Sequence, residues 1–261
     1  MTDPAPILET RDLTVRFGGQ VAVNGVTTSF AAGTLTAIVG PNGAGKTTFF
    51  NLVSGALRPT AGRVLLRGHD VTRASAAARA RAGIGRAFQR TSLFPDLSAF
   101  ENVRLAVQAR AHEGLAMLEL TAAATVLAER AMACLERVHL AERATTPAAS
   151  LSHGDQRKLE VAILVALEPA VFLFDEPTAG MSVDEVPVIL DLIEGLRAER
   201  RHAILLVEHK MDVVDRLADR VVVLHQGALL ADGEPAEIIA SRLVQEAYLG
   251  LPPAEGEGAH G

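Results

Sequence analysis

The stretch from residue 35 to residue 57 decides the fold, and it reads LTAIVGPNGAGKTTFFNLVSGAL. Its apolar start predicts a short buried strand over Leu35–Val39, and its end has the periodicity of a helix over Lys46–Leu57. Between them, Gly40–Thr47 matches the phosphate-binding loop pattern G-x-x-x-x-G-K-[ST], in the strand-to-helix context that this pattern requires. A plain glycine turn needs neither the lysine nor the threonine, so a polyphosphate site is the stronger interpretation.

The residues of this loop have distinct expected roles. The glycines let successive backbone N–H groups turn toward a polyphosphate, and the following helix adds the positive end of its dipole. Lys46 is expected to reach the β- and γ-phosphates, and the Thr47 hydroxyl is expected to bind Mg²⁺. The residues predicted to bind the phosphate chain are Gly40, Pro41, Asn42, Gly43, Ala44, Gly45, Lys46, Thr47 and Thr48.

Two carboxylates, Asp175 and Glu176, follow a second predicted buried strand, Val171–Phe174. Acidic residues at the end of a buried strand are suited to bind a cation there. Because successive side chains of a strand point to opposite faces, the two carboxylates point in different directions. Asp175 is expected to hold Mg²⁺ through water, and Glu176 to polarise an attacking water. The alternative is that both acids stabilise a helix N-terminus.

Two further predicted strands also end in polar residues. Ile84–Phe88 ends at Gln89, and Ala203–Val207 ends at Glu208-His209. A lone histidine is more often a surface residue than a catalytic one. The carboxyl ends of parallel strands, however, meet at one edge of an open sheet, where ligands bind. We therefore expect these residues, the carboxylates and the phosphate loop to converge there.

Residues 151–156, LSHGDQ, open a helix after a loop. The Ser152 cap, the small Gly154 and the free N–H groups form a second anion site that lacks a lysine and a metal ligand. Such an incomplete site suggests that its other half comes from another subunit. The alternative is an ordinary capped helix start.

The rest of the chain alternates strands and helices, which favours an α/β fold with a mainly parallel sheet. Ile7–Val15 and Val21–Val26 flank FGGQ and predict an antiparallel hairpin. The segment between Gln89 and Ser152 lacks buried-strand runs and predicts an inserted helical subdomain. The other predicted elements are strands at Arg63–Leu66 and Val221–Leu224 and helices from Ser98-x-x-Glu101 to about Ala109, over Leu115–Val138 as one helix or two, from Ser152 to about Leu167, and from Ser182-x-x-Glu185.

The composition is that of a globular protein: 261 residues, 49% hydrophobic, with a formal net charge of −6. Cys134 is the single cysteine, so no intrachain disulfide is possible and a reducing compartment is favoured. No secretory signal is visible, and the most apolar stretch, Val161–Phe174, is too short to span a bilayer. We therefore expect a soluble protein that serves a membrane, if at all, from the surface of a partner.

The charge is unevenly distributed along this acidic chain. Residues 58–90 contain eight arginines and one acid, Asp70. Two interpretations remain open: a solvated arginine-rich face, or a surface that meets anionic phospholipid or an acidic partner.

The phosphate loop, Gln89, LSHGDQ, Asp175-Glu176 and His209, in this order and spacing, resemble the nucleotide-binding subunit of an ABC transporter. The resemblance covers about residues 7–250. It implies a P-loop NTPase core with an N-terminal antiparallel β-subdomain and an inserted helical subdomain. It places a RecA-like core with the β-subdomain at residues 6–90 and 165–250, the helical subdomain with the signature motif at 91–164, and a disordered tail at 251–261.

The resemblance also implies ATP and Mg²⁺ as cofactors and assigns roles to single residues. Phe17 takes the place of the aromatic side chain that stacks on adenine, and Gln89 contacts Mg²⁺ and senses the membrane subunit. Glu176 is the general base and His209 the γ-phosphate switch. The residues that face the γ-phosphate of ATP held by the other protomer are Ser152, His153, Gly154 and Asp155.

Two departures from the common family pattern narrow the resemblance. The signature reads LSHGD rather than LSGGQ, and Ser182 stands where many relatives carry aspartate. Both departures resemble forms found in the subfamily that imports branched-chain and other hydrophobic amino acids. So do the stretches GIGRAFQRTSLFPDLSAFENV, EHKMDVV and EAYLG.

This subfamily implies an ATP-hydrolysing importer subunit on the cytoplasmic face of the inner membrane. Its implied partners are a second cassette (a copy or a paralogue), membrane permease subunits and, indirectly, an extracytoplasmic solute-binding protein, without nucleic acid. Three alternatives stay open: an importer of urea, short amides or another solute, a soluble ABC-type ATPase acting on nucleic acid through the arginine-rich stretch, and a phosphate-loop kinase.

Overall fold

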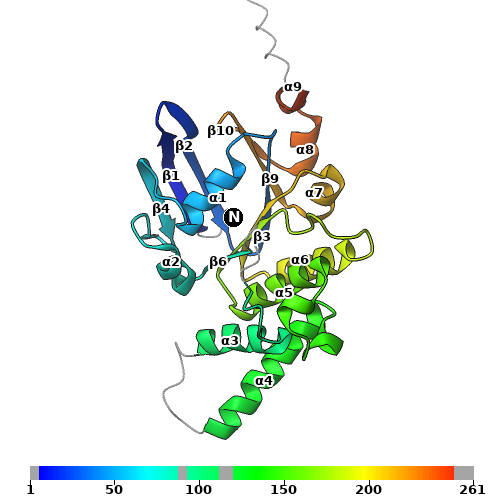
Figure 1. The fold of residues 1–261 in the computed structure, drawn as a ribbon. Helices are drawn as coiled ribbons and strands as arrows, with labels where there is room; N and C mark the ends of the chain where they lie inside the picture. Colours follow the sequence, from blue (N-terminus) through cyan, green and yellow to red (C-terminus); the bar gives the residue numbers. More distant parts are fainter. Residues whose placement is uncertain (1–5, 88–92, 112–119, 250–261) are drawn as a thin grey trace, which may run out of the picture.

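The computed structural model describes residues 6–87, 93–111 and 120–249 (Figure 1). Its central sheet has six strands in the order β10-β9-β3-β8-β7-β6. Their bounds are Thr34–Val39 (β3), Ile84–Ala87 (β6), Val171–Asp175 (β7), Ala203–Val207 (β8), Arg220–His225 (β9) and Ala228–Gly233 (β10). The five strands β9, β3, β8, β7 and β6 pair in parallel, and β10 joins β9 antiparallel at the edge. The predicted mainly parallel core is confirmed.

A second, antiparallel sheet has the strand order β2-β1-β4-β5. Its strands are Pro6–Phe17 (β1), Gln20–Ala31 (β2), Ala61–Leu66 (β4) and His69–Asp70 (β5). The predicted N-terminal hairpin is confirmed, and both of its strands are longer than predicted. Leu8, Leu13, Val23 and Val26 of this hairpin are fully buried against the core.

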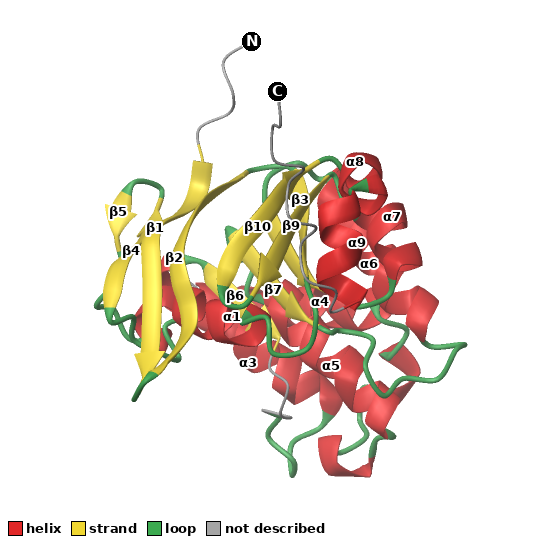
Figure 2. Ribbon diagram, turned by 90° about the horizontal axis from the view of Figure 1, so that it is seen from above, coloured by secondary structure: helices red, strands yellow, loops and turns green. Residues whose placement is uncertain are grey.

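The helices surround the central sheet and build the inserted subdomain. The bounds of those in and around the central sheet are Lys46–Ser54 (α1), Ala76–Ala82 (α2), Val186–Ala198 (α6), Met211–Leu217 (α7), Pro235–Ala240 (α8) and Arg242–Leu249 (α9). The insertion contributes Ala99–Ala111 (α3), Leu120–Arg137 (α4), His153–Ala166 (α5) and two 3-10 turns, Ala141–Arg143 and Ala148–Ser150. Figure 2 shows the antiparallel sheet on one side of the central sheet and α6 to α9 on the other.

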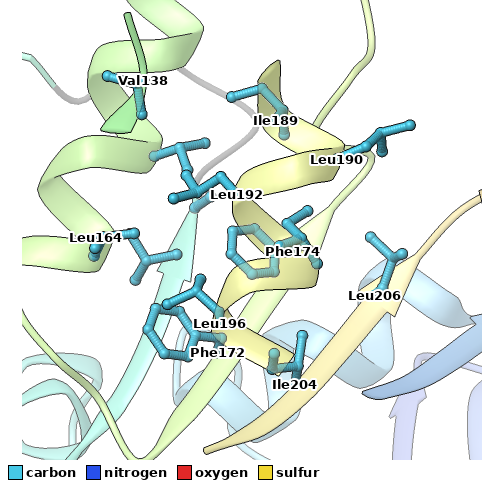
Figure 3. Packing of buried hydrophobic residues seen from close by; sticks show 14 of the residues in the cluster. Val138, Leu164, Phe172, Phe174, Ile189, Leu190, Leu192, Leu196, Ile204 and Leu206 are labelled. Atoms are coloured by element: carbon cyan, nitrogen blue, oxygen red, sulfur yellow. The ribbon is translucent and has the colours of Figure 1, made fainter. Parts of the chain in front are cut away.

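Alternation along the central strands divides the core into two layers. On one face, Phe172 and Phe174 stack with centroids 5.8 Å apart, and they pack with Leu192 and Leu196 of α6 (Figure 3). On the other face, Leu173 belongs to a cluster that includes the α1 phenylalanines and residues of the hairpin. Because both faces are covered, β7 and β8 are buried along their whole length, as in parallel sheets generally.

The register of the parallel strands brings the predicted polar ends to one edge. Asp175 pairs with Val207 across β7 and β8, and Ile38 pairs with Val207 across β3 and β8. The residues that follow these strands are the phosphate loop, Glu176 and Glu208-His209. Their predicted convergence is therefore confirmed, whereas Phe88 and Gln89 lie outside the described residues, as does the tail at 251–261.

Some predicted boundaries are wrong. Helix α1 ends at Ser54 instead of Leu57, because Gly55 adopts the left-handed conformation (φ 79°) that terminates a helix. Helix α6 begins at Val186 rather than at Ser182, since Pro187 is tolerated only in the first turn. Helix α4 falls within the predicted 115–138 segment, of which residues 115–119 lie outside the described part.

Two arginines of the arginine-rich stretch are buried, and both interpretations of it stay open for the exposed ones. Arg79 is 1% exposed and donates hydrogen bonds to the carbonyls of Leu52, Val53 and Thr72. The Arg86 side chain is only 6% exposed. The exposed arginines within the described part of this stretch are Arg58, Arg63, Arg67, Arg73 and Arg81.

No helix in residues 6–87, 93–111 and 120–249 combines the length and the apolar character needed to cross a bilayer.

Candidate functional site

Two glycines of the phosphate loop occupy positions that no other residue can take. Gly40 and Gly45 have φ values of 147° and 98°, a region that side chains disfavour. A Cβ on Gly40 would lie 2.1 Å from the Leu224 carbonyl oxygen, and one on Gly45 would lie 2.5 Å from the Ala22 carbonyl oxygen. The loop is therefore wedged between β9 and the hairpin, and α1 begins directly behind it at Lys46.

Lys46 lies folded over the loop that precedes it. Its Nζ donates to the carbonyl oxygens of Gly40 (2.7 Å) and Pro41 (3.0 Å), and the residue is 6% exposed. Burial lowers the pKa of this ammonium group, and the nearby carboxylates of Glu176 and Asp175 partly oppose that shift. The oxygens of a bound phosphate can replace these two carbonyl oxygens as hydrogen-bond acceptors for Lys46.

A cavity of about 450 Å³ opens in front of the loop. Its walls combine the loop with residues that lie far away in sequence: Gln20, Val21, Ala22, Asn42, Gly43, Ala44, Gly45, Lys46, Thr47, Thr48, Glu176, His209, Gln226 and Gly227. Seven of the nine predicted phosphate-binding residues, Glu176 and His209 are thus brought together. Gln20–Ala22 and Gln226-Gly227 were missed by the sequence analysis, since nothing local marks residues that a sheet brings alongside a loop.

Phe17 lies at the end of β1, beside the turn that leads to Gln20, and its side chain is 51% exposed. It is not among the residues that line the cavity. Its contact with adenine stays a prediction.

Glu176 and His209 form a close pair at the cavity. Glu176 Oε1 lies 2.8 Å from His209 Nε2, and both side chains remain more than one third exposed. Glu176 has a left-handed backbone (φ 49°), and its N–H donates to the Val207 carbonyl. Buried Glu208 accepts hydrogen bonds from the His209 N–H and the Thr178 hydroxyl, which orients the start of the His209 loop. This geometry can orient a water molecule against a phosphate.

Asp175 is completely buried, and its two carboxylate oxygens have different surroundings. Oδ2 accepts a hydrogen bond from Arg86 Nη2 at 2.8 Å, whereas Oδ1 has no partner within the described part of the chain. Burial raises the pKa of Asp175, and the bond to Arg86 opposes the shift. An unpartnered carboxylate oxygen and the Thr47 hydroxyl fit Mg²⁺, which combines few protein ligands with phosphate oxygens and water. The described residues contain no group of three or more metal-binding side chains.

The LSHGDQ segment caps α5 as predicted. The Ser152 hydroxyl accepts a hydrogen bond from the Asp155 N–H at 3.1 Å. Within the described residues, none from Ser152 to Asp155 lines the phosphate cavity; His153 instead lines a separate cavity of about 300 Å³, which also contacts Asp175 and Glu176. The second anion site therefore lies apart from the phosphate loop of the same chain.

Buried Arg157 supports the carboxylate loop and was missed by the sequence analysis. Its Nη2 donates to the carbonyls of Asp175 and Glu176, each at 3.2 Å, and its Nε donates to the Pro177 carbonyl. Its place directly after LSHGDQ was the one available signal.

The chain is similar to known proteins over most of its length. The ABC transporter family profile matches residues 23–179. The high-affinity branched-chain amino acid transport ATP-binding protein BraF of Pseudomonas aeruginosa is 40% identical over 250 residues, covering 94% of this chain and 98% of BraF. The corresponding LivG of Escherichia coli is 38% identical with the same coverage. The crystal structure of the ADP conformation of MJ1267, an ATP-binding cassette of an ABC transporter, superposes with a TM-score of 0.79 at 27% identity, covering 94% of this chain and 99% of that one.

The family profile covers more than half of the chain, and the two transport proteins match it almost from end to end. The predicted family and fold class are thereby confirmed. The chain belongs to the ABC transporter family and is one of its ATPase cassettes.

Proposed function

We propose that the chain is the ATP-hydrolysing subunit of an importer for branched-chain or related amino acids. The pairing of Glu176 with His209 at 2.8 Å, on the wall of the phosphate-loop cavity, carries the hydrolytic part of this proposal. The near full-length similarity to BraF and LivG supports the transported class.

In the proposed reaction, the loop N–H groups and Lys46 bind the β- and γ-phosphates of ATP. Thr47 and Asp175 hold Mg²⁺, which neutralises charge on the phosphate oxygens when it is bound. Glu176 accepts a proton from the attacking water, and His209 holds the Glu176 carboxylate in place and senses the γ-phosphate. Gln89 remains a predicted Mg²⁺ contact and sensor of the membrane subunit.

We further propose that a second cassette completes each site. The capped N-terminus of α5 offers N–H groups to an anion, but it lies apart from the chain's own phosphate cavity. Ser152, His153, Gly154 and Asp155 of one protomer would face the γ-phosphate bound to the other. ATP then closes the pair, and hydrolysis reopens it.

In this proposal the cassette works on the cytoplasmic face of the membrane, bound to permease subunits. These partners and an extracytoplasmic binding protein select the solute, so importers of urea, amides or other solutes remain alternatives. The test is to purify the complete transporter, reconstitute it in vesicles and measure ATPase activity with solute-loaded binding proteins. Stimulation by a leucine-loaded protein is expected. Stimulation by a urea- or amide-loaded protein alone would replace the proposed solute class.

A further inference from the structure

Arg86 joins the two elements that carry the proposed Mg²⁺ ligands. From β6, its Nη2 donates to Asp175 Oδ2 at 2.8 Å. Its Nη1 donates to Asn51 Oδ1 at 2.6 Å and to Ser54 Oγ at 3.3 Å, both on α1. One guanidinium group therefore bridges the end of β7, which holds Asp175, and α1, which begins with Lys46 and Thr47.

This bridge lies in the interior, where its geometry is closely constrained. The side chains of Arg86 and Asp175 are 6% and 0% exposed. The Phe50 ring lies against the guanidinium, with 5.9 Å between Cζ and the ring centroid. Because a guanidinium is planar and its donors point in set directions, two partners together determine its orientation.

The bridge leaves one oxygen of Asp175 available. Arg86 occupies Oδ2, whereas Oδ1 is buried without a hydrogen-bond partner in the described part of the chain. A buried carboxylate oxygen without a hydrogen-bond partner costs free energy, so its presence here points to a ligand that binds it. Arg86 therefore holds one oxygen of the carboxylate and leaves the other free to bind a metal ion.

We propose that Arg86 is a positioning residue for the Mg²⁺ of bound ATP. It holds the Asp175 carboxylate and α1 in the relative placement that lets Asp175 Oδ1 and the Thr47 hydroxyl reach one ion. This inference rests on the proposed function and adds a residue to it. A lysine at position 86 keeps the charge, but all its donors are on one nitrogen, so it cannot bridge Asp175 and Asn51 as the fork does.

The test compares Arg86→Lys with Arg79→Lys in the full chain. Arg79 is a matched control, because it is also a buried arginine that holds the end of α1, but through the carbonyls of Leu52 and Val53. Binding of a fluorescent, non-hydrolysable ATP analogue is measured by titration in EDTA and at increasing Mg²⁺. In EDTA, we expect wild type, Arg86→Lys and Arg79→Lys to bind the analogue with equal affinity. Mg²⁺ should raise the affinity for the analogue in all three. The Mg²⁺ concentration that gives half of this increase should be about 10- to 100-fold higher in Arg86→Lys alone.

A second variant keeps the inference testable if Arg86→Lys does not fold. Asn51→Ala removes the shorter of the two links to α1 and leaves the Arg86–Asp175 pair intact, so a smaller rise in the Mg²⁺ requirement is expected. An unchanged requirement in the folded Arg86 and Asn51 variants, or an equal shift in Arg79→Lys, would overturn the positioning role. If the wild-type chain bound no analogue in either condition, the proposed function would fail as well.

Discussion

Glu176 combines a left-handed backbone (φ 49°) with a side chain held 2.8 Å from His209. A non-glycine residue at positive φ costs free energy, so the surrounding bonds must hold it there. The Glu176 N–H bond to Val207 and the Arg157 bond to its carbonyl are such contacts. The carboxylate is thus aimed into the phosphate cavity rather than left free to rotate away.

Glu176→Gln should therefore separate binding from hydrolysis. The amide keeps the shape and a polar contact to His209 but cannot accept a proton, so turnover is expected to fall about 10²- to 10⁴-fold. Affinity for ATP, measured by fluorescence titration, should stay within a few-fold of the parent. Turnover close to that of the parent would remove Glu176 from the role of general base.

A neighbouring carboxylate occupies the space that a side chain at Gly154 would need. A Cβ at this position would lie 2.2 Å from Glu185 Oε1. Glu185 is itself held by Lys158 (3.4 Å) and by the Ser182 hydroxyl (2.9 Å). Lys158 also binds Asp155 at 3.1 Å, so the two departures from the family pattern, Asp155 and Ser182, belong to one network.

Gly154→Ala should be less stable than Gly195→Ala by about 1 kcal/mol, because the Glu185 carboxylate must leave its contacts with Lys158 and Ser182. The matched control is Gly195→Ala in α6, where an added Cβ meets nothing within 4 Å and stability should be kept or slightly raised. Urea unfolding of both variants measures the difference. Equal stabilities would contradict this explanation, and Glu185→Ala in the Gly154→Ala background should recover part of the loss.

At the scale of elements, the sequence predicts what local chemistry determines. The Ser98–Glu101 capping box forms with both reciprocal hydrogen bonds, and α3 follows it as predicted. In the second box the Ser182 N–H and hydroxyl donate to the Glu185 carboxylate, but the helix begins only at Val186, one residue before the proline. Local signals therefore locate an element more reliably than its ends.

Long-range partners explain what the sequence could not reveal. In the sequence, Arg86 is one of eight arginines in a basic stretch. Nothing nearby singles it out, because its partner Asp175 lies 89 positions away. The sequence did allow the Glu176–His209 pair to be expected, since both residues lie within two positions of the ends of buried strands in one sheet. Short helices such as α2 and the edge strand β10 have too few apolar positions for a periodic signal.

The capping box of α3 also predicts a dependence of stability on pH. Hydrogen bonds from the Ser98 N–H and hydroxyl lower the pKa of Glu101. A lowered folded-state pKa means that this stabilisation is complete above the unfolded pKa of about 4.3, and that it is lost as pH falls through the lower folded value. Glu101→Gln removes the titrating group and keeps an acceptor. Between pH 5 and pH 3, thermal unfolding should show a smaller loss for this variant than for wild type; equal losses would exclude the box as a cause.

At the scale of the whole molecule, the two parts of the proposed ATP site lie at different places on the same chain. The phosphate loop, Glu176 and His209 share one cavity, and the capped start of α5 lies outside it. Cyclic pairing of two such chains is the simplest way to bring the parts together, because each copy then supplies what the other lacks.

Mixing two inactive variants tests this pairing directly. Lys46→Ala disables the phosphate loop, and Ser152→Asp keeps a good helix cap while its charge repels the γ-phosphate, so each variant alone should be nearly inactive in ATP hydrolysis. In a mixed pair, one site combines an intact Lys46 with an intact Ser152, and the other site carries both defects. An equal mixture should therefore regain about a quarter of wild-type turnover if two copies pair at random. Full turnover of Ser152→Asp alone would show that α5 takes no part in hydrolysis, and no recovery in the mixture would show that the second cassette is not a copy of this chain.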